Sequence, residues 1–285
     1  MKEKIELVVT KPDKPCGRGL KPNPSPVKGK ARELGLSVVS PERVVDIKDK
    51  LKGFDLGVLV AYGLFIPKSV RELFRYGIIN LHPSLLPKYR GAAPIQWALL
   101  NGEKETGVSI IYLTEELDAG DVILQKKLEI SSQDDAEVLS YKLSILGAEA
   151  LKNVLRILEE NGRIECTPQA LLGEPSYAPK ITPEMGRIDW NENAINIFNK
   201  IRALKIWPKA YFYMNNIRVN ILESEPSKED DTPGKIIKLD NEKGILVATG
   251  KGSLWLKMVQ PESRKVMRGI DFSNGYRIEI GGVLK

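Results

Sequence analysis

The sequence predicts an α/β protein in which a Rossmann-like domain with a mostly parallel sheet precedes a smaller β-rich domain. Two observations predict this division. Up to about residue 165, short apolar runs alternate with amphipathic helical segments, which is the pattern of βαβ units. Beyond residue 180, one helical segment precedes several short alternating strands, which favours a small OB-like β-barrel. We therefore expect a first domain at 1–165, a linker at 166–180 and a second domain at 181–285.

The first domain is expected to begin with a short buried strand and a loop from residue 11 to 26 that holds five prolines. Ser25-Pro26 is typical of a helix start and Gly35 of a helix end. The apolar run at 55–63 is typical of a strand covered on both faces. In chain order, strands are expected at 5–10, 36–40, 55–63, 77–84, 107–113 and 122–130, and helices at 25–34, 67–74, 92–100 and 134–161.

The second domain is expected to begin with a helix at 194–204. Asn215-Asn216, Asn241 and Gly250 are typical of turns between short strands. The strands of the barrel are expected near 210–223, 234–239, 244–249, 253–259 and 276–280.

The composition excludes several classes of protein. Hydrophobic residues make up 42% and charged residues 28%, a globular balance, and no apolar run approaches the ~18 residues of a membrane span. The N-terminal segment is too charged for a signal peptide. The two cysteines, Cys16 and Cys166, form no C-x-x-C pair. We expect a cytoplasmic, reduced protein without a membrane partner, and a monomer.

Basic residues gather near the N-terminus. Between residues 11 and 30 there are six basic side chains and a single acid, Asp13. Together with the net charge of +6, this favours a polyanionic partner such as a nucleic acid. The alternative is a solvated surface loop without a ligand. The basic residues are Lys11, Lys14, Arg18, Lys21, Lys28 and Lys30.

The single histidine, His82, limits the available chemistry. One His and two distant Cys leave a structural zinc site without ligands, so we expect no metal. Asn80 and His82 stand two apart at the end of a predicted strand, so their side chains point to the same side. Asp118 lies in a turn that could approach the same sheet edge, where α/β proteins bind ligands. An amide, an imidazole and a carboxylate suit acyl transfer, in which they stabilise an oxyanion and move a proton.

Two other interpretations stay open on the residues alone. A lone His beside a proline turn is often a structural residue, and Asn80 and Asp118 are common turn residues. A hydrolase triad of Ser84, His82 and Asp118 is conceivable, although no G-x-S-x-G motif surrounds Ser84.

The segment NLHPSLLPKYRGAAPIQWALLNGEKETGVSIIYLTEELDAGDVILQ, residues 80–125, resembles the core of the formyltransferase family that uses 10-formyltetrahydrofolate. The signature of that family, Asn-x-His-x-Ser-Leu-Leu-Pro and then Leu-Asp-x-Gly, is matched at 80–87 and 117–120. VVTKPDKPCGRGLKPNPSPVK is similar to the loop with which members that act on initiator methionyl-tRNA enter the acceptor stem. GRIDWNENAINIFNKIRALKIWPKAYF and QPESRKVMRGIDFSNGYRI resemble their RNA-contacting barrel, so the resemblance covers almost the whole chain.

The resemblance implies transfer of a formyl group from 10-formyltetrahydrofolate to the α-amine of methionyl-initiator tRNA, in translation initiation. It implies that Asn80 and His82 stabilise the oxyanion, while Asp118 favours protonated His82 and helps to remove the amine proton. It places Ser84, Leu85, Leu86 and Pro87 against the folate, and Arg18 against the tRNA, with Lys14 and Lys21 as weaker phosphate contacts. Trp207 could stack on a base, although a position in the core is the more usual one for Trp.

Two rival functions fit parts of the sequence. One is a sister formyltransferase or formyl-folate hydrolase acting on a small amine or on water. The other is a non-catalytic tRNA-binding protein. Family members carry a further strand, a Gly-Thr-Pro turn and a helix ahead of the first strand matched here. We expect that the full protein starts earlier, that the sheet closes over the gap or borrows a strand, or that only tRNA binding is kept.

Overall fold

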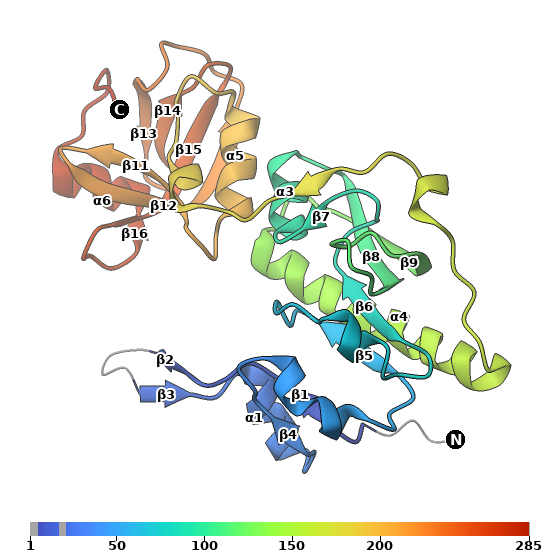
Figure 1. Cartoon of the computed structure of the whole chain (residues 1–285). Helices are drawn as coiled ribbons and strands as arrows, with labels where there is room; N and C mark the ends of the chain where they lie inside the picture. Colours follow the sequence, from blue (N-terminus) through green and yellow to red (C-terminus); the bar gives the residue numbers. More distant parts are fainter. Residues whose placement is uncertain (1–4, 17–20, 285) are drawn as a thin grey trace. The chain divides into compact units, whose positions relative to one another are not determined.

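The computed structural model describes residues 5–16 and 21–284, which pack as two units (Figure 1). The first unit comprises Met1–Pro87, Val108–Lys126 and Leu146–Glu174, and the second comprises Lys88–Gly107, Lys127–Ile145 and Pro175–Lys285. Each unit therefore gathers several stretches of the chain, and the boundaries expected from the sequence stay a prediction. Across the described ranges, no helix is both long enough and apolar enough to cross a membrane.

The proline-rich segment near the N-terminus contains a hairpin, so the prediction of a loop was wrong for its strands. β2 (Lys14–Cys16) pairs antiparallel with β3 (Lys21–Asn23), and Pro15 stands opposite Pro22. Facing prolines are compatible with such a pair, because every second pair of residues in an antiparallel ladder exchanges no hydrogen bonds.

The elements that flank this hairpin agree with the prediction. β1 (Val8–Val9) pairs in parallel with β4 (Val38–Val39). Between them, α1 (Pro26–Glu33) begins at the expected cap, where Ser25 Oγ accepts a hydrogen bond from Lys28 N at 3.1 Å. The chain leaves α1 through Gly35, whose φ of 67° suits a residue without a Cβ.

Asn80 and His82 lie on one strand of a four-stranded sheet. β5 (Gly57–Val60) pairs in parallel with β6 (Ile78–His82), and β6 pairs antiparallel with β8 (Glu105–Tyr112). β9 (Val122–Glu129) completes the order β5-β6-β8-β9. The α/β class of the first domain is confirmed.

β5 differs from the prediction of a strand covered on both faces. Val58 and Val60 are 47% and 50% exposed, whereas Leu59 packs with the core. Only one face is covered, by the helix α2 (Lys68–Arg71) and by an unpredicted 3₁₀ segment, η1 (Val44–Leu51). An apolar run does not reveal whether both faces of a strand will be covered, which explains the error.

The long helix α4 (Ala136–Asn161) confirms the helix predicted at 134–161. Its Gly147 lies directly against β6, since a Cβ added there would come within 2.7 Å of the Leu81 side chain. This close approach fixes the strand that carries the candidate site.

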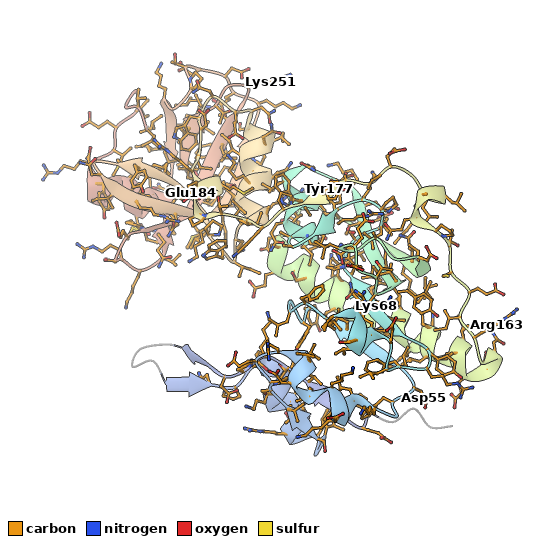
Figure 2. All side chains as sticks on the ribbon, in the orientation of Figure 1. Asp55, Lys68, Arg163, Tyr177, Glu184 and Lys251 are labelled. Atoms are coloured by element: carbon orange, nitrogen blue, oxygen red, sulfur yellow. The ribbon has the colours of Figure 1, made fainter. Side chains whose placement is uncertain are left out.

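In the second unit, the last part of the predicted linker pairs with a strand from the middle of the chain. β10 (Tyr177–Ala178) pairs in parallel with β7 (Arg90–Gly91) and leaves the Tyr177 side chain exposed (Figure 2). Trp97, in α3 (Pro94–Leu100), donates its indole N–H to Pro179 O at 2.8 Å. The linker is therefore held by hydrogen bonds along part of its length.

The β-rich second part predicted from the sequence, with an OB-like barrel as the expected form, is confirmed as a domain with an antiparallel sheet. It follows the short η3 (Pro183–Gly186) and α5 (Ala194–Ala203). Asn215 and Asn216 both have positive φ, 50° and 64°, and form the predicted turn between the first two strands. In spatial order the strands are β11 (Ala210–Met214), β12 (Ile217–Ser227), β15 (Ser253–Pro261), β14 (Gly244–Ala248) and β13 (Ile236–Asp240), and β16 (Met267–Arg268) pairs with β15.

The strand predicted at 276–280 was wrong. This part of the chain holds α6 (Gly269–Tyr276), which ends at Arg277 in a left-handed conformation with φ of 54°. Phe272 and Tyr276, one helical turn apart, place their rings 4.7 Å from each other. Ile278 packs on the core beyond the helix, so the alternating residues that suggested a strand reflect packing of an irregular segment.

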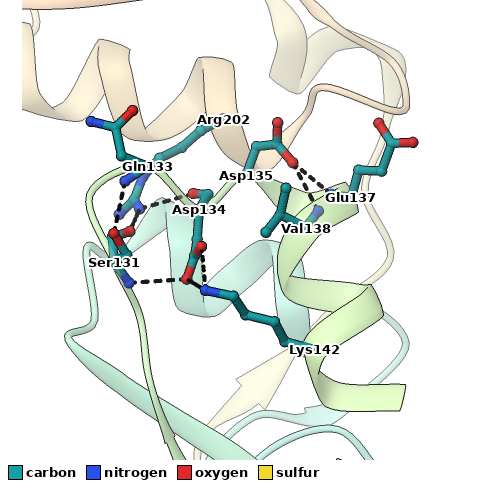
Figure 3. Close-up of polar contacts among 8 residues, drawn as sticks. All are labelled: Ser131, Gln133, Asp134, Asp135, Glu137, Val138, Lys142 and Arg202. Carbon is teal, nitrogen blue, oxygen red and sulfur yellow. Dashed lines mark hydrogen bonds and ion pairs between the residues drawn. The ribbon is translucent and has the colours of Figure 1, made fainter. Parts of the chain in front are cut away.

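Arg202, on α5, ties the β-rich part to the loop before α4 (Figure 3). The buried guanidinium donates through Nη1 to Ser131 O and Asp134 O, at 3.3 and 3.2 Å, and through Nε to Asn199 Oδ1 at 3.0 Å. Asp134, also buried, accepts from Lys142 Nζ at 2.7 and 2.9 Å. One charged side chain thus satisfies two carbonyls in a place with little access for water.

We predict that Arg202→Met lowers the free energy of unfolding by about 2–4 kcal/mol, because two carbonyls lose their charged donor in a buried place. Chemical denaturation monitored by circular dichroism measures this change. Arg268→Met is the matched control, since Arg268 pairs with Asp271 on the surface and its loss should change stability little. Equal stability of both variants would contradict the role of Arg202.

Candidate active site

β6 brings two candidate residues to its carboxyl end. Asn80 and His82 lie two apart on the strand, opposite Ile111 and Ser109 of β8. Both are buried, with 8% and 4% of their surface exposed. The strand ladder fixes their backbone, so their side chains leave the sheet on the same side.

Asp118 joins this pair, and the structure brings the three predicted catalytic residues together. Its Oδ1 accepts from Asn80 Nδ2 at 3.3 Å, and its Oδ2 lies 3.5 Å from His82 Nδ1. The Asp118 side chain is 10% exposed. One carboxylate therefore orients both an amide and an imidazole where solvent has little access. A carboxylate on Nδ1 fixes the tautomer of a His and leaves Nε2 for proton transfer.

The turn that carries Asp118 is held in an unusual conformation. Asp118 has φ of 52°, and a Cβ on Gly120 would come within 1.8 Å of Tyr112 O. Arg71 Nη1 donates to Thr114 O at 2.8 Å on the other side of the turn. The Leu-Asp-x-Gly motif thus needs its glycine for close backbone packing, and its Asp tolerates the left-handed region.

Gln169 completes this support, and the sequence analysis missed it. It lies in η2 (Gln169–Leu171), is 3% exposed, and donates through Nε2 to Asp118 O and Gly120 O, both at 2.8 Å. It falls inside the predicted linker, and no local pattern marks it.

The predicted folate segment is tightly anchored. Ser109 Oγ donates to Ser84 O at 2.7 Å and accepts from Leu86 N at 3.0 Å, and Gln125 Nε2 donates to Leu86 O at 2.7 Å. Ser84 and Leu86 are 0% and 1% exposed, and Leu86 belongs to a small core cluster. In this segment, Leu85 is the half-buried side chain, while Pro87 is buried. Contact with a ligand is therefore open to Leu85 and to the backbone.

The burial of Ser84 argues against the hydrolase triad of Ser84, His82 and Asp118. A nucleophile must be reached by its substrate, and the Ser84 side chain has no exposed surface. The remaining chemistry is that of Asn80, His82 and Asp118.

Two of the three predicted tRNA-binding residues, Lys14 and Lys21, lie on the N-terminal hairpin. Lys14 opens β2 and Lys21 opens β3, where it stands opposite Cys16. Arg18 lies outside the described residues. The only acid of the segment, Asp13, forms an ion pair with Lys28 at 2.7 Å, so its charge is already compensated.

The thiol of Cys166 lies beside the turn of Asp118. Its Sγ is 3.7 Å from Asp121 Oδ2. Partial burial and the Asp121 carboxylate both raise the pKa of this thiol, which favours the protonated, weakly reactive form.

Comparison with known proteins places the chain among the transferases of the formyl group. Residues 1–155 match the family model "Formyl transferase", and residues 180–277 match "Formyl transferase, C-terminal domain". The chain belongs to the formyl transferase family.

The relatives narrow the class. The chain is 44% identical over 284 residues to the methionyl-tRNA formyltransferase of Thermodesulfovibrio yellowstonii, covering 98% of this chain and 90% of that protein. It is 41% identical to the enzyme of the same name from Thermus thermophilus, with coverage of 98% and 91%. Its fold resembles HypX from Aquifex aeolicus in complex with tetrahydrofolic acid, with a TM-score of 0.65 and 21% identity. That match covers 88% of this chain but less than half, 44%, of HypX.

We predict that Gln169→Leu reduces formyl transfer by about tenfold or more, because the turn of Asp118 loses two hydrogen bonds and no longer fixes the carboxylate. Steady-state kinetics should show the loss in kcat, with a shifted pH profile, since the environment of His82 changes. Gln133→Leu, at an exposed position, is the matched control. If both variants keep the parent's kcat and pH profile, Gln169 does not position the site.

Proposed function

We propose that this chain transfers a formyl group from 10-formyltetrahydrofolate to the α-amine of methionyl-initiator tRNA, in the cytoplasm, for translation initiation. The relatives named methionyl-tRNA formyltransferase support this substrate, and the solved HypX complex supports a folate-type donor. The observation that carries the proposal is the Asp118 carboxylate, which lies against both Asn80 and His82 at the end of β6.

The proposed chemistry is an acyl transfer from the folate to the amine, and it needs no further reactant. The amine nitrogen attacks the formyl carbon, an N–C bond forms, and the formyl oxygen takes up negative charge. Asn80 and His82 donate hydrogen bonds to that oxygen. The bond from the formyl carbon to N10 of the folate then breaks, and the amine proton ends on the folate nitrogen.

Asp118 serves two purposes in this scheme. Its Oδ2 lies against Nδ1 of His82 and fixes the orientation of the imidazole ring. It also stands ready to accept the amine proton, directly or through water. Because both donors are oriented by the same carboxylate before the substrate binds, little reorganisation is needed during the reaction.

The folate fits beside the segment from Ser84 to Pro87. The carbonyl and N–H groups that anchor this segment are already bonded to Ser109 and Gln125, which gives a rigid wall. We propose that Leu85 and the adjoining backbone contact the donor, while Ser84, Leu86 and Pro87 keep the wall in place.

We predict that His82→Ala lowers kcat for formyl transfer by about 10²-fold or more and leaves the affinity for tRNA unchanged, because an oxyanion donor is lost without a change in the RNA contacts. Rapid-quench kinetics with methionyl-initiator tRNA measures the first quantity, and filter binding measures the second.

Asp118→Asn, alone and combined with His82→Ala, sharpens this test. Residues that act as a unit show non-additive losses, so the double variant should be little worse than His82→Ala alone. Unchanged turnover in His82→Ala would remove His82 from the mechanism, and strictly additive losses would separate the roles of the two residues.

For the RNA partner, we predict that Arg18→Ala raises the apparent KM for methionyl-tRNA several-fold and reduces the salt dependence of binding, because a phosphate contact is lost. Lys14 and Lys21 should contribute less. Arg32→Ala, on the exposed face of α1, is the matched control. Identical salt slopes for the parent and Arg18→Ala would contradict a phosphate contact at Arg18.

A further inference from the structure

A cavity of about 440 Å³ lies beside Arg202, between α5, the strands β12 and β15, and the loop before α4. Every residue that lines it belongs to the second unit. Its volume is within the range of sites that bind small molecules. The side chains that give this cavity its chemical character are Lys104, Ile195, Phe198, Arg202, Ser224 and Lys257.

Positive charge exceeds negative charge around this cavity. Lys104 has no carboxylate partner among the residues that the structure describes. Lys257 lies 3.4 Å from Glu225, but the same carboxylate lies 3.8 Å from Lys243 and is therefore shared by two lysines. Arg202 donates to carbonyl and amide oxygens, which carry no net charge. Three cations thus line the cavity beside a single carboxylate, that of Glu225.

Two buried polar groups on the wall of the cavity add to this imbalance. Arg202 is 8% exposed, and burial lowers the pKa of its guanidinium, an effect that the Asp134 carboxylate opposes. That carboxylate is already bonded to Lys142 Nζ at 2.7 Å (Figure 3). Ser224 Oγ is buried and has no hydrogen-bond partner within the described ranges. A buried hydroxyl without a partner costs free energy, which a ligand that bonds to it would recover.

A β-bulge brings Lys257 to the cavity. Ser224 of β12 stands opposite Leu256 of β15. The next paired residue of β15 is Met258, so the ladder passes over Lys257. An extra residue of this kind changes the direction of its side chain, and such bulges are frequent beside binding sites. Lys257 therefore reaches the cavity through a local departure from regular pairing.

We propose that this cavity binds a small organic phosphate, a monoester whose oxygens are held by Lys104, Lys257 and the hydroxyl of Ser224. Three cations and one carboxylate leave two positive charges, which match a phosphate monoester dianion. Lysine binds phosphate as a point charge. The organic part lies against Phe198 and against Ile195, which is 55% exposed. Binding of this ligand does not depend on formyl transfer.

The charge and the burial favour a small molecule over an RNA chain. A phosphodiester inside an RNA chain carries one negative charge and has a nucleoside on each side. It is therefore suited to exposed lysine and arginine side chains, which position RNA backbones, and not to a buried hydroxyl. A phosphate monoester has three free oxygens and can reach Ser224 Oγ together with both lysines.

The test is isothermal titration calorimetry of the full chain with adenosine monophosphate, and with adenosine and inorganic phosphate for comparison. The monophosphate should bind, whereas adenosine, which lacks the dianion, should give no measurable heat. Lys104→Ala should raise the Kd for the monophosphate by about tenfold, through loss of a charge-assisted hydrogen bond, and Ser224→Ala by about 2- to 10-fold. Ile195→Ala should weaken binding of the monophosphate and leave that of inorganic phosphate unchanged.

Lys265→Ala is the matched control, because Lys265 is an exposed lysine of the same unit that does not line the cavity. Circular dichroism confirms folding of each variant. A folded parent that binds no monophosphate overturns the proposal, and so does a Kd that is equal in the parent, Lys104→Ala and Lys265→Ala. Weaker binding of tRNA to Lys104→Ala, with an unchanged Kd for the monophosphate, would assign the cations to RNA instead. A chain that binds the monophosphate as expected but transfers no formyl group contradicts the proposed function alone.

Discussion

The candidate site depends on one carboxylate. Asp118 accepts from Asn80 and lies against His82, so the orientation of both donors follows from its position. That position is determined by a turn in which Asp118 has a positive φ and Gly120 packs against the backbone of Tyr112. Because a left-handed residue costs free energy, surrounding contacts must hold it, and the two hydrogen bonds from Gln169 do so. Strand β6 supplies Asn80 and His82, and the turn supplies the carboxylate that orients both side chains.

The segment that follows His82 is held differently from the Asp118 turn, because the polar atoms that anchor it belong to its backbone. Ser109 and Gln125, on β8 and β9, satisfy the carbonyl and amide groups of the segment after His82. Leu86 fills a small apolar cluster beneath them. A segment whose backbone is hydrogen-bonded in this way has little freedom to move, which suits the proposed role of contacting the formyl donor. Gly147, packed against Leu81 from α4, restrains the same strand from another element.

The sequence predicted the parts of this arrangement that are local. Asn80 and His82 could be placed together because a strand has a period of two. Asp118 could be placed with them only through the family resemblance, because β8 is antiparallel to β6 and the turn after β8 begins beside Ile78, the first residue of β6. Gln169 could not be found, since it lies 51 residues from Asp118 and the contact depends on the path of an irregular segment. The exposure of β5 and the helix α6 were missed for a related reason. Apolar alternation records which residues are buried, but not which neighbours bury them, and Ile278 is packed without being in a strand.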